Sequence, residues 1–351
     1  MGMKVTSHDV ARAAGVSRTT VSMVLNGSNA VSLSEETRAR VRQAAAELGY
    51  RINSAGRMLA SGATKTIALI VTNPELLLID GFIPPTLYAI SREATLHGYN
   101  VLIEGLPPEG DERGYRDLVM ARRIDGMIVL NPRSNDPQLA ALIEQKFPVV
   151  LLGAIRDSNA VSLGIDDREA ISKAVAHLVQ LGHRSIGHVA LSARGTYATD
   201  HRIAALRAAL KWNGLALLEA HVDYANFDAE SGRLAAHRLL DAQPSLTAII
   251  AGNDTIALGV MRAARERGMS LPRDLSIIGY DDLPFAAFLE PALTTIRTRP
   301  VEQGAMATRM LIGMIGGDGA RAPTAELTAD FVQRGSCAAP PEVPLPLVGR
   351  G

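Results

Sequence analysis

The chain has 351 residues, 47% of them hydrophobic, which is enough to fill the cores of two or three globular domains. It has no apolar run of about 18 residues and no charged N-terminal segment followed by an apolar stretch, which argues against a membrane span or a secretory signal and favours a cytoplasmic protein. The single cysteine, Cys337, excludes an intrachain disulfide and argues against a cysteine-built metal site, so no metal or cofactor is expected.

The formal net charge is zero, but the charge is unevenly distributed. Residues 1–60 carry eight lysines and arginines against four aspartates and glutamates, a net charge of +4, and the rest of the chain carries −4. A basic region attracts the phosphates of a nucleic acid. We therefore expect a DNA-binding domain at the N-terminal end of an otherwise acidic chain.

Residues 6–26 have the pattern of two short helices that meet at a glycine. The first helix begins at Thr6, whose hydroxyl can cap it while Asp9 lies three residues further on, as in a capping box. Gly15 can adopt the positive φ of a tight turn, and Ser17 can then cap the second helix. A helix-turn-helix is therefore expected here.

A third helix is expected over about residues 34–48, ending at Gly49. Val41, Ala45 and Leu48 share one face of this helix. They can close a small core with the apolar residues of the first two helices, so the N-terminal region is predicted to be an all-α domain.

From Thr66 onward, apolar runs alternate with segments of helical period. Runs typical of buried strands are 67–71, 101–104, 127–130, 149–152, 185–190, 248–251 and 276–279. The helical segments are 85–97, 112–123, 168–181, 201–213, 229–241 and 254–267. This alternation predicts doubly wound parallel sheets, and the length of the region favours two α/β lobes over a single sheet.

The segment DVARAAGVSRTTVSMVLN (9–26) resembles the start of the lactose-repressor/galactose-repressor (LacI/GalR) family of bacterial transcription factors. Further matches follow in order: Thr37-Arg38-x-Arg40-Val41, Leu48-Gly49-Tyr50, Gly182-His183, Asn253-Asp254-x-x-Ala257-Leu258-Gly259, Gly279-Tyr280-Asp281-Asp282 and Pro291-Ala292-Leu293-Thr294-Thr295-Ile296. The resemblance extends over about residues 5–336. It implies a helix-turn-helix followed by a two-lobed, periplasmic-binding-protein-like core.

The second helix of the helix-turn-helix is expected to lie in the DNA major groove, where its N-terminal residues meet base edges. Arg18 can donate two hydrogen bonds to a guanine, Thr19 can bond to a base or contact a thymine methyl, and Met23 can make only apolar contact. Ser22 shares this outer face. The competing interpretation, a small helical bundle with solvated arginines, leaves the matches elsewhere in the chain without an explanation.

Residues 51–62 resemble the family's hinge, which the resemblance implies folds on operator DNA and inserts a leucine into the minor groove. By alignment that leucine is Leu59, with Asn53 as a cap and Arg57 near phosphate. A flexible linker with Leu59 simply exposed is the alternative. The residues expected to contact DNA are Thr6, Ser17, Arg18, Thr19, Ser22, Met23, Asn26, Asn53, Arg57 and Leu59.

The two-lobed core implies a small-molecule effector, bound beyond the carboxyl ends of strands. The candidates at such positions are Asn73, Arg202, Phe227, Asn253, Asp254 and Asp281. In sugar-binding members a carboxylate and an amide hold hydroxyl groups while an aromatic ring stacks on the sugar, roles open to Asp281, Asn253 and Phe227. Arg202 adds a fork of donors. Helix capping by Asn253 and Asp254 and a turn at Asp281 are the alternative interpretations.

Some positions depart from the family's pattern. Gly153 stands where members often have an aspartate after a strand, which argues against a monosaccharide effector. Gly56 stands in the hinge where alanine is common, at a cost of about 1 kcal/mol in helix propensity. The segment 31–37 is two residues longer than usual, so that either Ser32 or Ser34 can cap the third helix.

The expected domains follow from these matches. They are a helix-turn-helix domain (1–50), a hinge (51–65), an effector-binding and dimerisation core (66–337) and a disordered tail (338–351). Each lobe of the core is expected to cross back, which places about 66–164 and 295–323 in the N-lobe and 165–294 and 324–337 in the C-lobe.

The sequence thus predicts a homodimeric, ligand-responsive transcriptional repressor that binds a pseudo-palindromic operator in double-stranded DNA, with a carbohydrate or related metabolite as effector. The alternative is a solute-binding protein with no regulatory role, whose core would show the same pattern. No nucleophile elbow, phosphate-binding loop or metal-ligand spacing is present, so an enzyme is not expected. His183 is interpreted as ending a helix, where a cationic ring suits the helix dipole.

Overall fold

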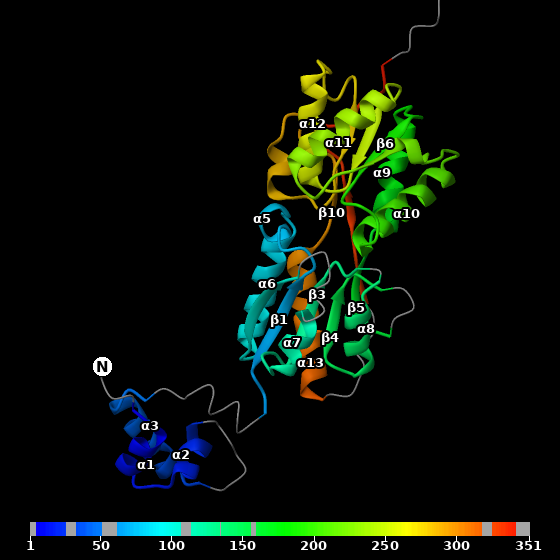
Figure 1. Cartoon of the computed structure of the whole chain (residues 1–351). Helices are drawn as coiled ribbons and strands as arrows, with labels where there is room; N and C mark the ends of the chain where they lie inside the picture. The colour runs from blue at the N-terminus through cyan, green and yellow to red at the C-terminus, as the bar shows by residue number, and fades with distance from the viewer. Residues whose placement is uncertain are drawn as a thin grey trace, which may run out of the picture. The chain divides into compact units, whose positions relative to one another are not determined.

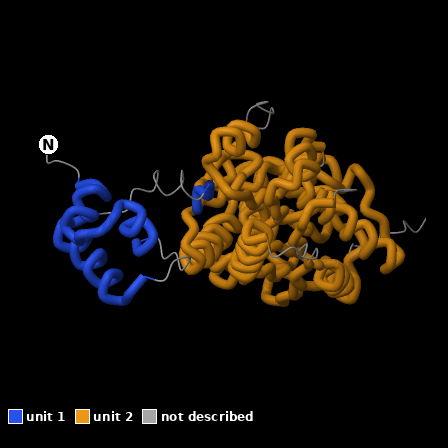
Figure 2. The backbone as a smooth tube through the Cα atoms, turned by 90° about the horizontal axis from the view of Figure 1, so that it is seen from below, with its two compact units in different colours: residues 1–65 blue, residues 66–351 orange. Residues whose placement is uncertain are grey.

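The computed structural model describes residues 5–25, 33–50, 62–106, 114–133, 135–155, 159–317 and 325–341. The chain forms two compact units, residues 1–65 and residues 66–351 (Figure 2). In its described residues the first unit contains helices α1 (Ser7–Ala14), α2 (Arg18–Leu25) and α3 (Glu35–Glu47). The second unit alternates strands with helices (Figure 1).

The predicted helix-turn-helix is confirmed. The carboxylate of Asp9 accepts hydrogen bonds from the backbone nitrogen and the hydroxyl of Thr6, at 2.9 and 2.7 Å, and so closes the first turn of α1. Gly15 adopts a φ of 65°, at which α1 ends. The hydroxyl oxygen of Ser17 then accepts a hydrogen bond from the backbone nitrogen of Thr20 at 3.1 Å, which caps α2.

Helix α3 begins after Ser34, whose hydroxyl oxygen accepts a hydrogen bond from the backbone nitrogen of Thr37 at 3.2 Å. Ser34 is therefore the cap of α3. Val41 and Ala45 are buried in a core shared with α1 and α2, as predicted. Leu48, predicted on the same face, is 37% exposed, because α3 ends one residue before it.

The second unit has two lobes, which we call the N-lobe and the C-lobe. In the described residues the N-lobe is built on a parallel sheet with the strand order β11-β5-β4-β3-β1-β2. Its strands are β1 (Thr66–Val71), β2 (Asn100–Gly105), β3 (Gly126–Leu130), β4 (Val149–Leu152), β5 (Val161–Asp166) and β11 (Ala325–Thr328). Its helices are α5 (Leu76–Ile79), α6 (Ile83–Leu96), α7 (Gly114–Met120), α8 (Pro137–Glu144) and α13 (Pro300–Gly316).

Both faces of the N-lobe sheet are covered by helices, as the continuous apolar runs predict. Alternate residues of β1 face opposite sides of the sheet. Ile67 and Leu69 pack in a core with residues of α6 and α13, whereas Ala68 and Ile70 pack in a second core with residues of α7 and α8. The central strands are therefore buried on both faces.

The C-lobe repeats this design on a parallel sheet with the order β7-β6-β8-β9 in the described residues. Its strands are β6 (Ile186–Ala190), β7 (Val222–Tyr224), β8 (Ala248–Ala251) and β9 (Ser276–Ile278), and β10 (Thr295–Arg297) pairs antiparallel with β12 (Asp330–Val332). Its helices are α9 (Arg168–Gln180), α10 (Tyr197–Trp212), α11 (Ala229–Ala242) and α12 (Asp254–Glu266), with short 3-10 helices at Glu219–His221 and Pro284–Phe288.

The chain crosses between the lobes a few residues later than the sequence predicts. Strand β5 continues to Asp166 in the N-lobe sheet, beyond the expected boundary at residue 164. Strand β10, expected to open the N-lobe return, pairs with β12 in the C-lobe, and β11, expected in the C-lobe, pairs with β5 in the N-lobe. Strands of three or four residues have too short a pattern to reveal which sheet they join; their hydrogen-bonded partner decides it.

The segment expected to be a disordered tail begins inside the folded core. The backbone nitrogen of Ala338 donates a hydrogen bond to the hydroxyl oxygen of Ser276 at 3.0 Å. The carbonyl oxygen of Ala338 also accepts a hydrogen bond from that hydroxyl at 3.1 Å. Residues 342–351 lie outside the described residues.

Helices α11 and α12 approach each other closely at glycines. A Cβ atom at Gly259 would overlap the carbonyl oxygen of Ala229 and lie 2.6 Å from the backbone nitrogen of Arg233. A Cβ atom at Gly232 would lie 2.8 Å from the carbonyl oxygen of Ile256. Since the opposing atoms are backbone, a side chain at these positions can fit only if the helices separate.

We predict that Gly259→Ala destabilises the core by about 3 kcal/mol, because a methyl group forced against backbone overpacks the α11–α12 interface. Urea unfolding followed by circular dichroism measures the change. Gly313→Ala, also within a helix, meets no atom within 4 Å, and this control should leave the stability unchanged or raise it by up to about 1 kcal/mol. Equal effects of the two substitutions would contradict the packing argument.

Candidate functional site

Helix α2 presents one polar face to solvent. Its valines pack in the core of the first unit, whereas Arg18, Thr19 and Ser22 are exposed and Met23 is half-buried. These four side chains lie on the outer face predicted for DNA contact. The helix is therefore free to enter a major groove without disturbing the core.

Two other residues predicted at the DNA interface form hydrogen bonds within the first unit. Thr6 donates its hydroxyl to Asp9, and Ser17 accepts from Thr20, so both side chains stabilise helix N-termini. The remaining predicted DNA contacts, Asn26, Asn53, Arg57 and Leu59, lie outside the described residues.

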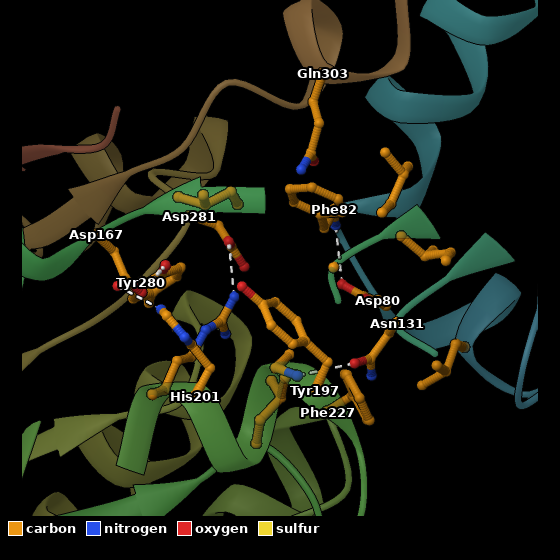
Figure 3. A pocket seen from close by; sticks show the side chains of 18 residues that line it. Asp80, Phe82, Asn131, Asp167, Tyr197, His201, Phe227, Tyr280, Asp281 and Gln303 are labelled. Atoms are coloured by element: carbon orange, nitrogen blue, oxygen red, sulfur yellow. Dashed lines mark hydrogen bonds and ion pairs between the residues drawn. The ribbon is translucent and has the colours of Figure 1, made fainter. Parts of the chain in front are cut away.

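The second unit contains a cavity, partly open to solvent, between its N-lobe and C-lobe (Figure 3). Its N-lobe wall comes from the ends of β3 and β4, from β5, from the loop between α5 and α6, and from α13. Its C-lobe wall comes from α10 and from the residues that follow β6, β7 and β9. The cavity thus lies at the carboxyl ends of parallel strands, where ligands of such sheets bind.

Arg202 of α10 is the central charge of the C-lobe wall, although its side chain is only 13% exposed. Its Nη2 lies 3.7 Å from Oδ1 of Asp281, and its Nη1 donates a hydrogen bond to the carbonyl oxygen of Gly252. The guanidinium carbon lies 3.6 Å from the ring centroid of Tyr280, a cation–π contact. A buried charge needs such compensation, because an unpaired one is strongly destabilising.

Asp281 and Asp282 both have left-handed backbone conformations, with φ values of 104° and 59°. This strain costs about 1–3 kcal/mol per residue and is typical of functional sites. The carboxylate of Asp282 pairs with Arg297 at 2.7 Å and with Arg334 at 2.6 Å, which holds the turn in place. Burial raises the pKa of Asp281, and Arg202 opposes this shift by favouring the carboxylate.

Asp167 follows β5, at the point where the chain crosses from the N-lobe to the C-lobe, and it is part of the cavity wall. Its carboxylate accepts a hydrogen bond from Nε2 of His201 at 2.9 Å and one from the hydroxyl of Tyr280 at 2.7 Å (Figure 3). Although burial opposes ionisation, these donors hold the pKa of Asp167 below its ordinary value. Tyr280 is thereby fixed under the guanidinium group of Arg202.

Asn131 ties the two lobes together at the cavity. It follows β3 of the N-lobe, and its Oδ1 accepts a hydrogen bond from the backbone nitrogen of Ala198 at 3.0 Å, in the first turn of α10. Beside it, the carbonyl oxygen of Pro132 accepts one from the backbone nitrogen of Tyr197 at 3.2 Å. The structure is therefore a conformation in which the lobes are joined across the cavity.

Gly153, which follows β4, faces the ring of Tyr197. A Cβ atom at Gly153 would lie 2.7 Å from Cδ1 of Tyr197 and 3.1 Å from Cδ of Pro132, and the φ of Gly153 is 120°. The aromatic ring of Tyr197 therefore occupies the space that a side chain at position 153 would need.

Sequence analysis does not identify several polar residues of the cavity wall, among them Asp80 and Gln303. Asp80 lies between α5 and α6, where its Oδ1 accepts a hydrogen bond from the backbone nitrogen of Phe82 at 3.0 Å. Gln303 lies on α13 and donates from Nε2 to the carbonyl oxygen of Leu163 at 3.2 Å. Both are outside the motifs that match the family, and only the fold brings them to the cavity.

Of the six predicted effector-binding residues, Arg202, Phe227 and Asp281 line the cavity, and the other three do not. Asn253 caps α12 through Ile256, and its Nδ2 donates to the carbonyl oxygen of Phe227 at 3.1 Å, so it positions that ring.

Asp254 is fully buried, where its carboxylate accepts hydrogen bonds from the hydroxyl of Thr295 and the backbone nitrogen of Leu283, both at 2.6 Å. Asn73 accepts one from the backbone nitrogen of Glu75 at 3.1 Å, as in a turn. Asp254 therefore stabilises the core and Asn73 a local turn, and neither lines the cavity.

His183 lies just past the end of α9, as predicted, and its backbone nitrogen donates to the carbonyl oxygen of Leu178. The prediction that its ring is a cation there is wrong. The ring is 1% exposed, and burial lowers its pKa, which favours the neutral form. Nε2 lies 2.9 Å from the carbonyl oxygen of Ala338, an acceptor, so Nε2 donates. Nδ1 of the neutral ring then accepts from the hydroxyl of Thr247 at 2.8 Å. His183 is a structural link between the C-lobe sheet and the last described segment.

Among the described residues, none of the helices is long and apolar enough to span a membrane. No group of three or more His, Cys, Asp or Glu side chains in the described ranges is arranged to hold a metal ion.

A helix-turn-helix with a polar outer face, on one chain with a two-lobed core that encloses a cavity, defines a DNA-binding regulator with an effector domain. A family model described as bacterial regulatory proteins of the lacI family matches residues 6–53, and one described as a periplasmic binding protein-like domain matches residues 175–337.

Relatives match along nearly the whole chain. Catabolite control protein A of Priestia megaterium is 32% identical over 311 residues, covering 88% of this chain and 92% of that protein. The repressor CytR of Escherichia coli K12 is 32% identical over 340 residues, covering 96% and 97%. The crystal structure of the lac repressor dimer bound to operator and the anti-inducer ONPF has a TM-score of 0.82 at 28% identity, covering 95% and 99%. The chain belongs to the LacI family of bacterial transcriptional regulators.

We predict that Asp80→Asn changes the pH dependence of stability. Burial, and then the charge of Asp281, raises the pKa of Asp80 to about 7. The unfolded chain releases this proton near pH 4, so the folded state loses stability as pH rises from about 4 to about 7 and no more above that. The asparagine cannot ionise, so the fall in melting temperature between about pH 5 and about pH 8 should be smaller in the variant.

Thermal unfolding at the two pH values measures this difference. Asp241→Asn, which changes a carboxylate that pairs with Arg267 on the surface, is the matched control and should retain the wild-type fall. The same fall in wild type and Asp80→Asn would show that Asp80 does not titrate in this range.

Proposed function

We propose that this protein is a homodimeric repressor whose affinity for operator DNA changes when a small molecule fills the cavity between its lobes. The observation that carries the proposal is the cavity itself, with a compensated but buried Arg202, a strained Asp281 and the ring of Phe227 in its wall. The protein acts in the cytoplasm, where its DNA target lies, and it binds its effector without converting it. The named relatives are regulators, which supports this choice.

The operator is contacted through α2, with Arg18, Thr19 and Ser22 toward base edges and Met23 in apolar contact. The exposure of the polar side chains supports this arrangement. A dimer presents two such helices on one two-fold axis, which selects a pseudo-palindromic site. The lac repressor structure is a dimer bound to operator, which supports the same assembly here.

The hinge between the two units is proposed to add minor-groove contacts on operator DNA, through Leu59 as wedge, Asn53 as cap and Arg57 near phosphate. These residues lie outside the described ranges, and the proposal rests on their positions in the sequence. Asn26, the next residue in the sequence after Leu25, belongs to the same proposed surface.

Effector binding shifts a population between conformations of the core. The hydrogen bond from Ala198 to Asn131 holds one arrangement of the lobes, in which both walls of the cavity face the same volume. A ligand that contacts both walls at once favours this arrangement by its differential affinity for the two states. The same free energy then appears as a change in operator affinity.

We predict that Arg18→Ala relaxes operator choice at one base pair and weakens binding to the preferred operator about 5- to 150-fold, as expected for the loss of a base contact. Selection from a random DNA library, followed by fluorescence anisotropy on the selected sequences, measures both effects. Arg12→Ala, which removes an exposed arginine of α1, is the control and should leave sequence preference unchanged. A loss of affinity that is equal for all sequences would assign Arg18 to a phosphate instead.

We predict that Asp281→Ala abolishes the change in operator affinity on effector binding. A thermal-shift screen of sugars, sugar phosphates and nucleosides first identifies the ligand, because a ligand of the folded state raises the melting temperature. Operator titrations with and without that ligand then measure the response. Asp241→Ala should respond like the wild type, and an unchanged response in Asp281→Ala would remove this carboxylate from the effector site.

A further inference from the structure

Oxygen acceptors face the cavity from three separate elements. The carboxylate of Asp80 comes from the loop between α5 and α6, that of Asp281 from the turn after β9, and the carboxamide of Gln303 from α13 (Figure 3). The first and third belong to the N-lobe and the second to the C-lobe. A single group of a ligand that bonds to all of them would therefore join the two lobes.

The amide of Gln303 is fixed with its oxygen unpaired. Its side chain is 3% exposed, and Nε2 donates to the carbonyl oxygen of Leu163, which can only accept. This bond sets the orientation of the amide. Among the described residues Oε1 has no hydrogen-bond partner. Because buried polar atoms in folded proteins are almost always paired, this oxygen indicates a donor supplied by a ligand.

The charges of the cavity wall are unbalanced toward the negative. Asp167 already receives hydrogen bonds from His201 and Tyr280, and Arg202 is engaged by Asp281, by the carbonyl oxygen of Gly252 and by the ring of Tyr280. Asp80 forms no ion pair within the described part of the chain.

The excess of negative charge in the cavity wall contributes to the raised pKa of Asp80. Burial comes first, and the charge of Asp281 second, among the causes that raise its pKa to about 7, while Arg202 lowers it only in part. The carboxylate therefore lacks a cation of its own. The rings of Phe82 and Phe227 line the same volume from the two lobes, and aromatic faces attract cations.

We propose that the effector carries a protonated amino group, held between Asp80 and Asp281 with one N–H donated to Oε1 of Gln303. This inference rests on the proposed function, since it names the chemical class of the same effector. An ammonium group has N–H donors for all these acceptors and the charge that Asp80 lacks. A neutral hydroxyl would supply a single donor and no charge.

The test uses pairs of small probes that differ in one group: benzylamine and benzyl alcohol, cyclohexylamine and cyclohexanol, and glucosamine and glucose. Ligand-observed NMR and calorimetry with the full chain at neutral pH measure their affinities. Each amine should bind about 10- to 100-fold more tightly than its alcohol, as expected for charge-assisted hydrogen bonds.

Two variants locate the preference. Asp80→Asn should reduce the amine preference about tenfold or more, since the asparagine keeps the shape but removes the charge. Gln303→Leu should weaken the amines and leave the alcohols unchanged. Asp241→Asn, an equivalent change of a surface carboxylate, should retain the wild-type preference.

Equal or tighter binding of the alcohols would overturn the inference, as would amines that bind with the wild-type preference to Asp80→Asn or that do not bind at all. Operator titrations separate this outcome from failure of the proposed function. If neutral ligands alter operator affinity and amines do not, the effector class is wrong and the regulator remains. If amines bind with the expected preference but no ligand alters operator affinity, the site stands and the regulatory function fails.

Discussion

Burial of one cation, Arg202, organises the effector domain. A guanidinium group away from water must be surrounded by compensating groups, and here they come from the ends of β8 and β9 and from the ring of Tyr280. Tyr280 is held in turn by Asp167, at the point where the chain leaves the N-lobe. Arg202, Tyr280 and Asp167 are therefore connected by direct contacts. A ligand that moves Arg202 also acts on the segment that joins the lobes.

Much of the fold follows from local pattern, and the exceptions have physical reasons. Helices such as α9, α11 and α12 are long and amphipathic, so their period reveals them within a residue or two. Helix α13 escapes notice because the glycines within it, such as Gly304 and Gly313, lower its helix propensity. Strands β10, β11 and β12 are three or four residues long, and only pairing with distant strands defines them.

The effector site shows the same division. Asp281 could be predicted because it follows a strand in a matched motif, and Phe227 because it also follows a strand. The sequence places Arg202 near the start of a helix, and it lies in the second turn of α10. Asn253 satisfies the same rule yet bonds to backbone, since a polar side chain at a helix N-terminus can serve either a cap or a ligand and the sequence does not distinguish them. Gln303 has no local signal, because its nearness to the cavity is created by the return of the chain from the C-lobe.

The link between His183 and Ala338 affects where the protein can be modified. The histidine ring, the hydroxyl of Ser276 and the backbone of Ala338 satisfy one another in the interior of the C-lobe. A truncation before Ala338 would leave these polar groups without hydrogen-bond partners and destabilise the C-lobe. Affinity tags and fluorophores are therefore better attached beyond Ala338 than spliced before it. Attachment at the C-terminal end also leaves α2, near the other end of the sequence, free to contact DNA.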